Sequence, residues 1–158
     1  MGLFTRPRME VTVNEENVDV RGLNSRSGLE PVFHVIRRAA RSTGQAPWVI
    51  VGGPGVDPVQ PAQYALNPFR RHDWPPDAAL LWGDYVALLF AILLPRGKTL
   101  PWRRPNVHVL MRAPVAQHDR AEFEARARDA LARCGAWSVN FQWESTADAG
   151  VRGNSTAI

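Results

Sequence analysis

Three consecutive segments decide the fold: NVHVLMR (106–112), QHDRAEFEARARDALARC (117–134) and WSVNFQW (137–143). The middle segment repeats its apolar residues at helical spacing, and acidic–arginine pairs four residues apart occupy its other faces. The apolar stripe consists of Phe123, Ala127, Ala130, Leu131 and Cys134. The outer two segments alternate apolar and polar residues, which is typical of strands with one polar face. The sequence therefore predicts a strand, a helix and a strand in succession.

Shorter patterns occupy the first third of the chain. Residues 9–13 and 18–21 alternate with period two on either side of a turn-forming sequence, which predicts a β-hairpin. From residue 29 to 43, apolar residues recur at i, i+3, i+4 and i+7, and Pro31 suits a first helical position. This segment is predicted to be a helix. The β-branched run 48–51 is predicted to be a buried strand.

The centre of the chain combines a proline-rich loop with an apolar helix. Residues 52–76 are rich in proline and glycine, and a loop of this length in a compact domain is usually functional. Residues 78–94 are almost wholly apolar, and Asp77 is a suitable N-cap before them. This run is close to the length of a membrane span. Asp84 lies within it, however, and placing an aspartate at the centre of a bilayer costs about 2.5–3.5 kcal/mol. The sequence therefore predicts a helix lodged in the protein core, with Asp84 paired to a loop arginine or tryptophan.

These elements together predict an α+β fold. The expected architecture is a mixed or antiparallel sheet of about five strands with three helices, one of them fully buried. The expected order along the chain is ββαβ-loop-αβαβ. Residues 1–144 are predicted to form a single domain, and the small polar residues 145–158 are predicted to form a disordered C-terminal tail.

The basic composition of the chain does not by itself indicate a nucleic-acid-binding protein. The chain of 158 residues has a net charge of +4 and a sequence pI of about 10.2, but Lys98 is its only lysine. Arginine-heavy composition of this kind reflects codon bias as often as nucleic-acid binding. The single cysteine, Cys134, excludes an internal disulfide framework and a cysteine-based zinc site. Together with a start that lacks a secretory signal, this predicts a cytoplasmic location.

Enzyme and cofactor motifs are not recognisable in this sequence. A G-x-G-x-x-G pattern started at Gly53 meets Pro58 at its third position, and Lys98 lacks the leading glycine of a phosphate-binding loop. The histidines show no H-x-H or H-x-x-x-H spacing. We therefore expect no cofactor, no metal site and no catalytic residue. The adjacent pair His72 and Asp73, with Asp77 nearby, keeps open the alternative of a small enzyme with an acid–base site in the long loop.

Arginines beside aromatic residues recur on both sides of the apolar helix. These residues are Phe69, Arg70, Arg71, Trp74, Trp102, Arg103 and Arg104. Arginine and tryptophan dominate the binding energy of protein interfaces. The leading hypothesis is a non-enzymatic protein-binding domain, of the accessory, inhibitor or immunity type, that uses these segments and the proline-rich loop to bind another protein.

Nucleic-acid binding is the alternative from a different class. On the helix predicted for residues 29–43, one face carries His34, Arg37, Arg38 and Arg41, a stripe suited to tracking phosphates. Arginine and tryptophan in the loops also suit stacking on single-stranded bases. The sequence leaves the identity of the partner and the oligomeric state open.

Overall fold

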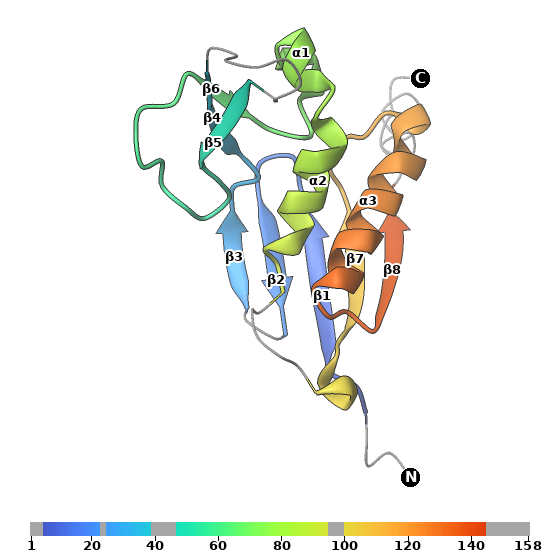
Figure 1. Ribbon diagram of the computed structural model, residues 1–158. Coiled ribbons are helices and arrows are strands. Elements are labelled where there is room, and N and C mark those ends of the chain that lie inside the picture. The colour runs from blue at the N-terminus through green and yellow to red at the C-terminus, as the bar shows by residue number, and fades with distance from the viewer. Residues whose placement is uncertain (1–4, 23–24, 39–46, 95–99, 145–158) are drawn as a thin grey trace, which may run out of the picture.

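A five-stranded sheet is the central element of the fold. The computed structural model describes residues 5–22, 25–38, 47–94 and 100–144. The strands of the large sheet lie in the order β3-β2-β1-β7-β8 (Figure 1). Their bounds are β1 Arg8–Val13, β2 Val18–Arg21, β3 Arg26–Leu29, β7 Asn106–Met111 and β8 Ser138–Trp143.

The sheet is mixed, as the sequence predicts. β1, β2 and β3 pair antiparallel as a meander, whereas β1 and β7 pair parallel with Val11 opposite Val109. β7 and β8 are also parallel, with Val109 opposite Phe141. A parallel pair needs a crossover connection. The short helix η3 (Gln117–Asp119) and α3 (Arg120–Arg133) supply it between β7 and β8. The strand–helix–strand prediction for residues 106–143 is confirmed.

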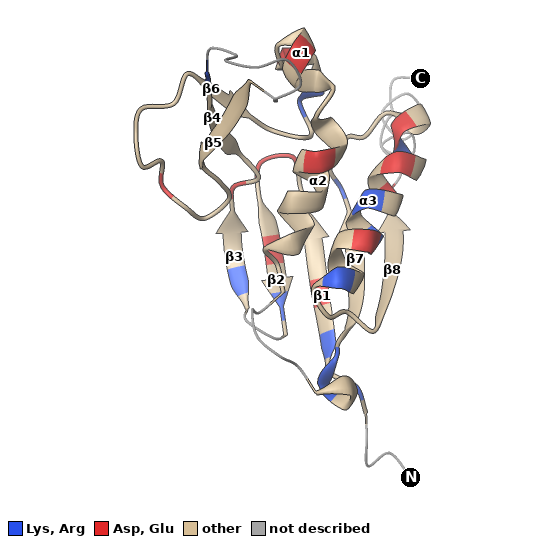
Figure 2. Cartoon of the chain, in the orientation of Figure 1, with Lys and Arg blue, Asp and Glu red and all other residues tan. Residues whose placement is uncertain are grey.

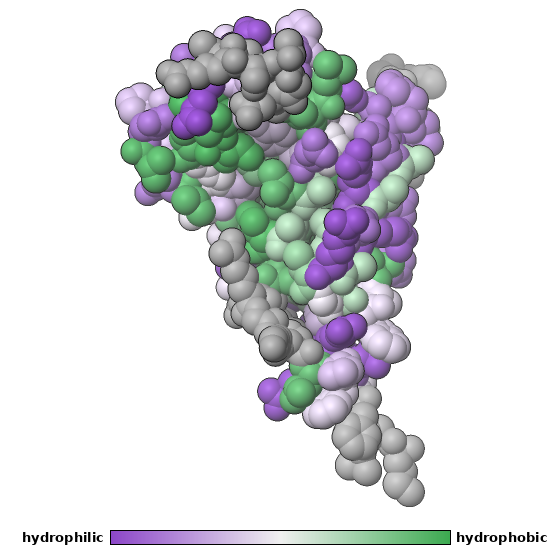
Figure 3. Space-filling view, viewed as in Figure 1, coloured by the Kyte–Doolittle hydropathy of each residue, from purple (hydrophilic) through white to green (hydrophobic). Residues whose placement is uncertain are grey.

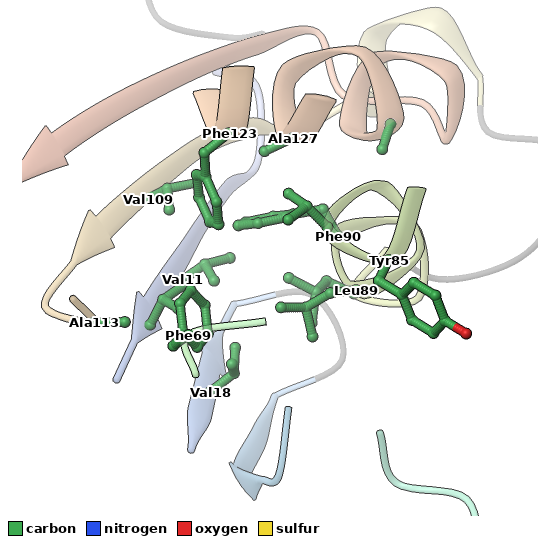
Figure 4. Packing of buried hydrophobic residues seen from close by; sticks show 14 of the residues in the cluster. Val11, Val18, Phe69, Tyr85, Leu89, Phe90, Val109, Ala113, Phe123 and Ala127 are labelled. Carbon is green, nitrogen blue, oxygen red and sulfur yellow. The ribbon is translucent and has the colours of Figure 1, made fainter. Parts of the chain in front are cut away.

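The main core lies between the sheet and two helices on one of its faces (Figures 1 and 4). Helix α2 (Trp82–Ala91) packs against α3, and Phe90 of α2 meets Phe123 of α3 with ring centroids 5.6 Å apart. Beneath them lie the inward valines of the sheet, including Val11 and Val109. Burying one such aliphatic or aromatic side chain contributes about 1.5–3 kcal/mol.

The other face of the sheet carries polar side chains. Alternation along each strand sends Glu10, Thr12, His108, Asn140 and Gln142 to this face, and each is exposed or half-buried. In the register, Glu10 lies opposite His108, which lies opposite Asn140. The helices therefore cover one face only, which is the arrangement that the alternating strands indicate.

A second, smaller sheet replaces the helix predicted for residues 29–43. β4 (Phe33–Arg37) lies between β5 (Trp48–Gly52) and β6 (Tyr64–Leu66), and both pairs are antiparallel. The helix prediction is therefore wrong over the described residues, and 39–43 lie outside them. Phe33 and Val35 are buried at period two, and Val35 and Ile36 are β-branched. The sequence fits both the helical period and the strand period of two. Pairing on both edges of β4 makes this segment a strand.

The apolar helix predicted for 78–94 is interrupted and only partly buried. A short helix α1 (Pro76–Ala79) comes first, and α2 starts at Trp82 after a turn. Leu80 in the turn is 84% exposed and Leu88 of α2 is 42% exposed, so the expectation of a fully buried helix is not confirmed. Figure 3 shows apolar surface over α2 beside the polar surface of α3. Within the described residues, no helix is both long and apolar enough to cross a membrane.

Gly22 makes a steric demand at the end of β2. Its φ is +105°, and a Cβ atom there would overlap the carbonyl oxygen of Arg8 on the neighbouring strand. We expect Gly22→Ala to lower the free energy of unfolding by about 1–3 kcal/mol, since it combines a strained φ with this overlap. Urea denaturation followed by tryptophan fluorescence measures the change.

Gly135 offers a matched control for this prediction. Its φ is +111°, but nothing lies within 4 Å of a Cβ atom built there. Gly135→Ala therefore reports the backbone strain without the overlap. An equal loss of stability in the two variants would show that the contact with Arg8 has no effect.

Candidate functional site

Tryptophans and arginines, all exposed except the half-buried Arg6, gather where β1 and β7 begin. The residues are Arg6, Arg8, Leu100, Trp102, Arg103, Arg104 and Trp137, which we call the arginine–tryptophan pole. Trp102 lies in the short helix η2 (Pro101–Arg103), directly before β7, and Trp137 directly precedes β8. Their side chains are 57% and 55% exposed. Figure 2 shows basic segments together at this end of the molecule.

Several contacts fix the segments of the pole relative to one another. Arg6 donates a hydrogen bond of 2.7 Å from Nη1 to the carbonyl oxygen of Pro101. The same guanidinium lies 3.5 Å from the ring centroid of Trp137, in a cation–π contact. The backbone N–H of Trp137 donates to the carbonyl oxygen of Pro105 at 2.8 Å. The N-terminal segment, η2 and the start of β8 thereby form one preorganised surface.

The charge of the pole is largely uncompensated. Arg8 pairs with Glu10 at 3.0 Å. Among the described residues, Arg103 and Arg104 form no ion pair, and both are exposed. Several arginines elsewhere in the fold are balanced locally, such as Arg133 by Asp129 at 3.0 Å, whereas Arg21, Arg26 and Arg38 are exposed and also form no ion pair among the described residues. The pole is therefore a place where the positive surplus of the chain meets solvent beside aromatic surface.

The predicted partner-binding residues divide into two groups at different places in the fold. Trp102, Arg103 and Arg104 form part of the pole, whereas residues 69–74 lie near the opposite ends of the strands, where β1 and β7 finish (Figure 1). Phe69 and Trp74 are each only 6% exposed. They belong to the hydrophobic core and do not offer a surface to a partner.

Arg70 and Arg71 are held by contacts within the fold. Arg70 binds Glu15 through Nε and Glu16 through Nη2, each at 2.9 Å. The hydrogen bond with Glu15 is the main cause that raises the pKa of Arg70. Arg71 lies over the ring of Trp82 at 4.9 Å and approaches Asp119 at 3.5 Å. Arg70 thus fastens the long loop to the turn between β1 and β2.

Four residues of the pole, Arg6, Arg8, Leu100 and Trp137, are not among the predicted candidates. Arg6 and Leu100 stand apart from the arginine–aromatic segments in the sequence, and Trp137 belongs to an alternating strand pattern. The parallel pairing of β7 with β8 brings Trp137 beside Pro105. A usable signal in the sequence is that Trp137 begins a predicted strand and Trp102 stands four residues before another.

The basic stripe behind the nucleic-acid hypothesis is not formed. His34 and Arg37 lie on β4, where neighbouring residues alternate between faces, and Arg38 follows the strand. Arg37 pairs with Asp77 at 2.9 Å, and Arg38 is exposed. Arg41 lies outside the described residues. A spacing of i, i+3, i+4 places side chains on one face only in a helix. Because this segment is a strand, the predicted basic stripe does not form.

The acid–base group considered in the long loop is open to solvent. His72 and Asp73 lie 3.3 Å apart, but their side chains are 79% and 65% exposed. Asp77, the third candidate, is paired with Arg37 instead. Within the described part of the chain, no three histidine, cysteine or acidic side chains are grouped to hold a metal ion.

Asp84 lies on the exposed side of α2 and affects its neighbour Tyr85. It pairs with Arg126 of α3 at 3.4 Å, and its side chain is 63% exposed. The expected partner was a loop residue, and the structure places it on a helix instead. Burial raises the pKa of Tyr85 above 10.0, and the charge of Asp84 raises it further. Figure 4 shows the Tyr85 hydroxyl directed away from the centre of the core.

A fall in stability at alkaline pH follows from this raised pKa. Below pH 10 both folded and unfolded chains keep Tyr85 protonated, and its contribution to stability is fully present. As the pH rises through the folded pKa, the unfolded chain has already released the proton, so the contribution is lost. We expect Tyr85→Phe to lose less stability than the unsubstituted protein between about pH 9 and pH 11. Urea unfolding at both pH values measures this, and parallel losses would contradict it.

Comparison with models of known protein families and with curated protein sequences returns no match to this chain. Its function therefore has to be inferred from the arrangement of its own side chains.

Proposed function

We propose that this chain is a non-enzymatic binding domain that docks an acidic protein partner on the arginine–tryptophan pole. One observation carries the proposal: two tryptophans, 57% and 55% exposed, stand on a preorganised surface with arginines that lack ion pairs within the described chain. Tryptophan and arginine are the side chains most enriched among binding hot spots.

The segments that form this surface are already held in place before a partner binds. Arg6 links η2 to Trp137 through a hydrogen bond and a cation–π contact, so docking need not immobilise these segments. Each tryptophan offers a large apolar area for burial against a partner. Arg103 and Arg104 supply charge that carboxylates on the partner would neutralise and that would accelerate association.

A protein partner fits the pole better than a nucleic acid does. On the open sheet face next to it, Glu10 and Asp19 offset Arg8 and Arg21, so this face offers a phosphate backbone no further positive stripe. The exposed tryptophans of the described chain stand at one end of the sheet and give no extended series of stacking platforms. The proline-rich loop, with Val56 and Val59 exposed, lies beside the small sheet and forms no part of the proposed surface. The proposal includes a cytoplasmic location, expected from the single cysteine.

Quantitative co-purification of the tagged full chain from its own cells tests the proposal. The variant Arg103→Glu/Arg104→Glu reverses the charge of the pole, and Arg38→Glu/Arg112→Glu reverses two exposed arginines elsewhere as a matched control. We expect a discrete acidic protein to be enriched with the unsubstituted chain and the control, and lost with the pole variant. Equal recovery with both variants would contradict the proposal.

An oligonucleotide titration separates the two partner classes. Fluorescent single- and double-stranded oligonucleotides are titrated at low and near-physiological salt, with anisotropy as the signal. We expect weak binding at low salt that disappears at the higher concentration, because a few arginines release only a few counterions. Tight binding that survives near-physiological salt and is lost in Arg103→Glu/Arg104→Glu would assign the pole to nucleic acid instead.

A further inference from the structure

A cleft lies at the end of the large sheet opposite the pole, between the connections that follow β1 and β7. After β1 the chain turns to β2 on one side, whereas after β7 it crosses through α3 to β8 on the other. The carboxyl ends of β1 and β7 are neighbours, since Val13 lies opposite Met111. Loops that leave adjacent parallel strands in opposite directions open a crevice between them, and ligands of open α/β sheets bind there.

The structure has a cavity of about 570 Å³ at this place. Glu15 of the β1–β2 turn borders it on one side, and the β7–α3 connection, including Pro114 and His118, borders it on the other. The short helix η1 (Arg71–Asp73) adds Arg71 and His72. This volume is within the range of small-molecule sites in proteins. We propose that this cleft binds a small anion, a carboxylate or a phosphate, that carries an apolar group.

Arg71 keeps hydrogen-bonding capacity toward the cleft. Glu15 is engaged by Arg70 at 2.9 Å, and Asp119 lies 3.5 Å from both Arg71 and His118. Arg71 has five N–H groups, and two of its nitrogens donate hydrogen bonds, at 3.5 Å to Asp119 and 3.3 Å to Ala79. Both are longer than a usual N–H···O bond. A ligand that supplies acceptor oxygens therefore complements Arg71.

The guanidinium of Arg71 is held in place for such a ligand. It lies over the ring of Trp82 at 4.9 Å, and Trp82 is itself 2% exposed and donates from Nε1 to the carbonyl oxygen of Pro68 at 2.7 Å. Arg71 keeps 39% of its side chain exposed. A planar guanidinium with a fixed orientation favours bidentate contact with a carboxylate or phosphate.

An exposed histidine and an apolar wall specify the ligand further. His118 precedes α3 and is 84% exposed. Pro114 and Val115 provide apolar surface. The carboxylate of Asp119 lies 3.5 Å from both Arg71 and His118, so the anionic end is placed on the exposed part of the Arg71 guanidinium, with the apolar group against the wall.

Four naphthalene derivatives test the ligand class on the full chain. 1-Naphthyl phosphate and 1-naphthoate carry the anion, 1-naphthol is neutral, and 1-naphthylmethylamine is cationic. The titration follows backbone amide shifts and the indole N–H of Trp82 by heteronuclear NMR. We expect both anions to shift the signals of Trp82 and of residues 114–119 saturably, with affinities at least tenfold above those of the neutral and cationic compounds. The ratio of the two anions then distinguishes a phosphate site from a carboxylate site.

Substitutions test the assigned donors. We expect Arg71→Met to weaken anion binding at least tenfold and His118→Gln to weaken it severalfold. Arg126→Met, which removes an arginine paired with Asp84 on the outer side of the helices, is the matched control and should bind normally. If Arg71→Met does not fold, His118→Gln and Arg71→Lys decide, since a lysine keeps the charge and loses the fork. Equal binding of 1-naphthol, or unchanged affinity in the cleft variants, overturns the proposal.

Discussion

Phe123→Ala is expected to lower the free energy of unfolding by about 3–5 kcal/mol. The side chain is 0% exposed and stands where α2, α3, the long loop and β8 meet. Its ring lies 5.6 Å from that of Phe90, 5.9 Å from Phe69 and 5.7 Å from Trp143, measured between centroids. Truncation therefore opens a cavity between four elements that cannot all move to close it.

Urea unfolding monitored by circular dichroism measures this loss. Domains of this size are usually stable by about 5–15 kcal/mol, so the variant loses a large part of its stability. Leu80→Ala is the control, because Leu80 is 84% exposed and its truncation is expected to cost less than about 0.5 kcal/mol. A loss below about 1 kcal/mol for Phe123→Ala would mean that α3 does not pack on the sheet as described.

Trp102→Ala is expected to have the largest effect on partner binding, a loss of about 30-fold in affinity. Removing a hot-spot tryptophan costs about 2 kcal/mol or more, which corresponds to that factor. Trp102 is 57% exposed, so its truncation should leave the free energy of unfolding almost unchanged. Isothermal titration of the co-purified partner gives the affinity, and thermal unfolding of the free chain gives the stability.

Matched substitutions separate the apolar from the electrostatic contribution at the pole. Trp102→Phe keeps part of the aromatic area and should recover part of the lost affinity. Arg103→Glu/Arg104→Glu should chiefly slow association at low salt and flatten or reverse its dependence on salt, since exposed charges act on the encounter and salt screens them. If Trp102→Ala binds as tightly as the unsubstituted chain, Trp102 lies outside the interface.

The parts of the fold that could be predicted are those where local pattern and tertiary pairing agree. The amphipathic stripe of α3 and the alternation of β7 and β8 each allow one interpretation, and the structure confirms them. The segment from Phe33 to Arg37 allows two. Its period-three-and-four spacing suggests a helix, but edge pairing with β5 and β6 supplies the hydrogen bonds that make it a strand.

The break between α1 and α2 gives no comparable signal in the sequence. Leu80 and Leu81 are good helix formers, and neither proline nor glycine marks the turn. Packing of Trp82 against Phe123, with centroids 6.1 Å apart, accompanies the new start of the helix. Local propensity did not foresee this, because the constraint comes from α3, some 40 residues further along the chain.

Only part of the arginine–tryptophan pole could be predicted from the sequence. A run such as Phe69-Arg70-Arg71 has the composition of an interface, but composition does not reveal burial. Phe69 enters the core, and Arg70 is neutralised by Glu15 and Glu16 from a distant turn. Trp102 and its neighbours stay exposed because η2 lies at the end of the large sheet, in the connection before β7 begins. Arg6 and Trp137 join them only through contacts between distant segments.

Site-specific photocrosslinking at the pole is the most direct measurement of the central claim. A benzophenone amino acid replaces Leu100, which is exposed beside Trp102, in the full chain within its own cells, and Leu80, also exposed but outside the pole, serves as the control position. The account predicts a discrete protein adduct from position 100 that is absent from position 80 and is lost with Arg103→Glu/Arg104→Glu. No adduct at position 100, the same adducts at both positions, or an adduct removed by nuclease would contradict it.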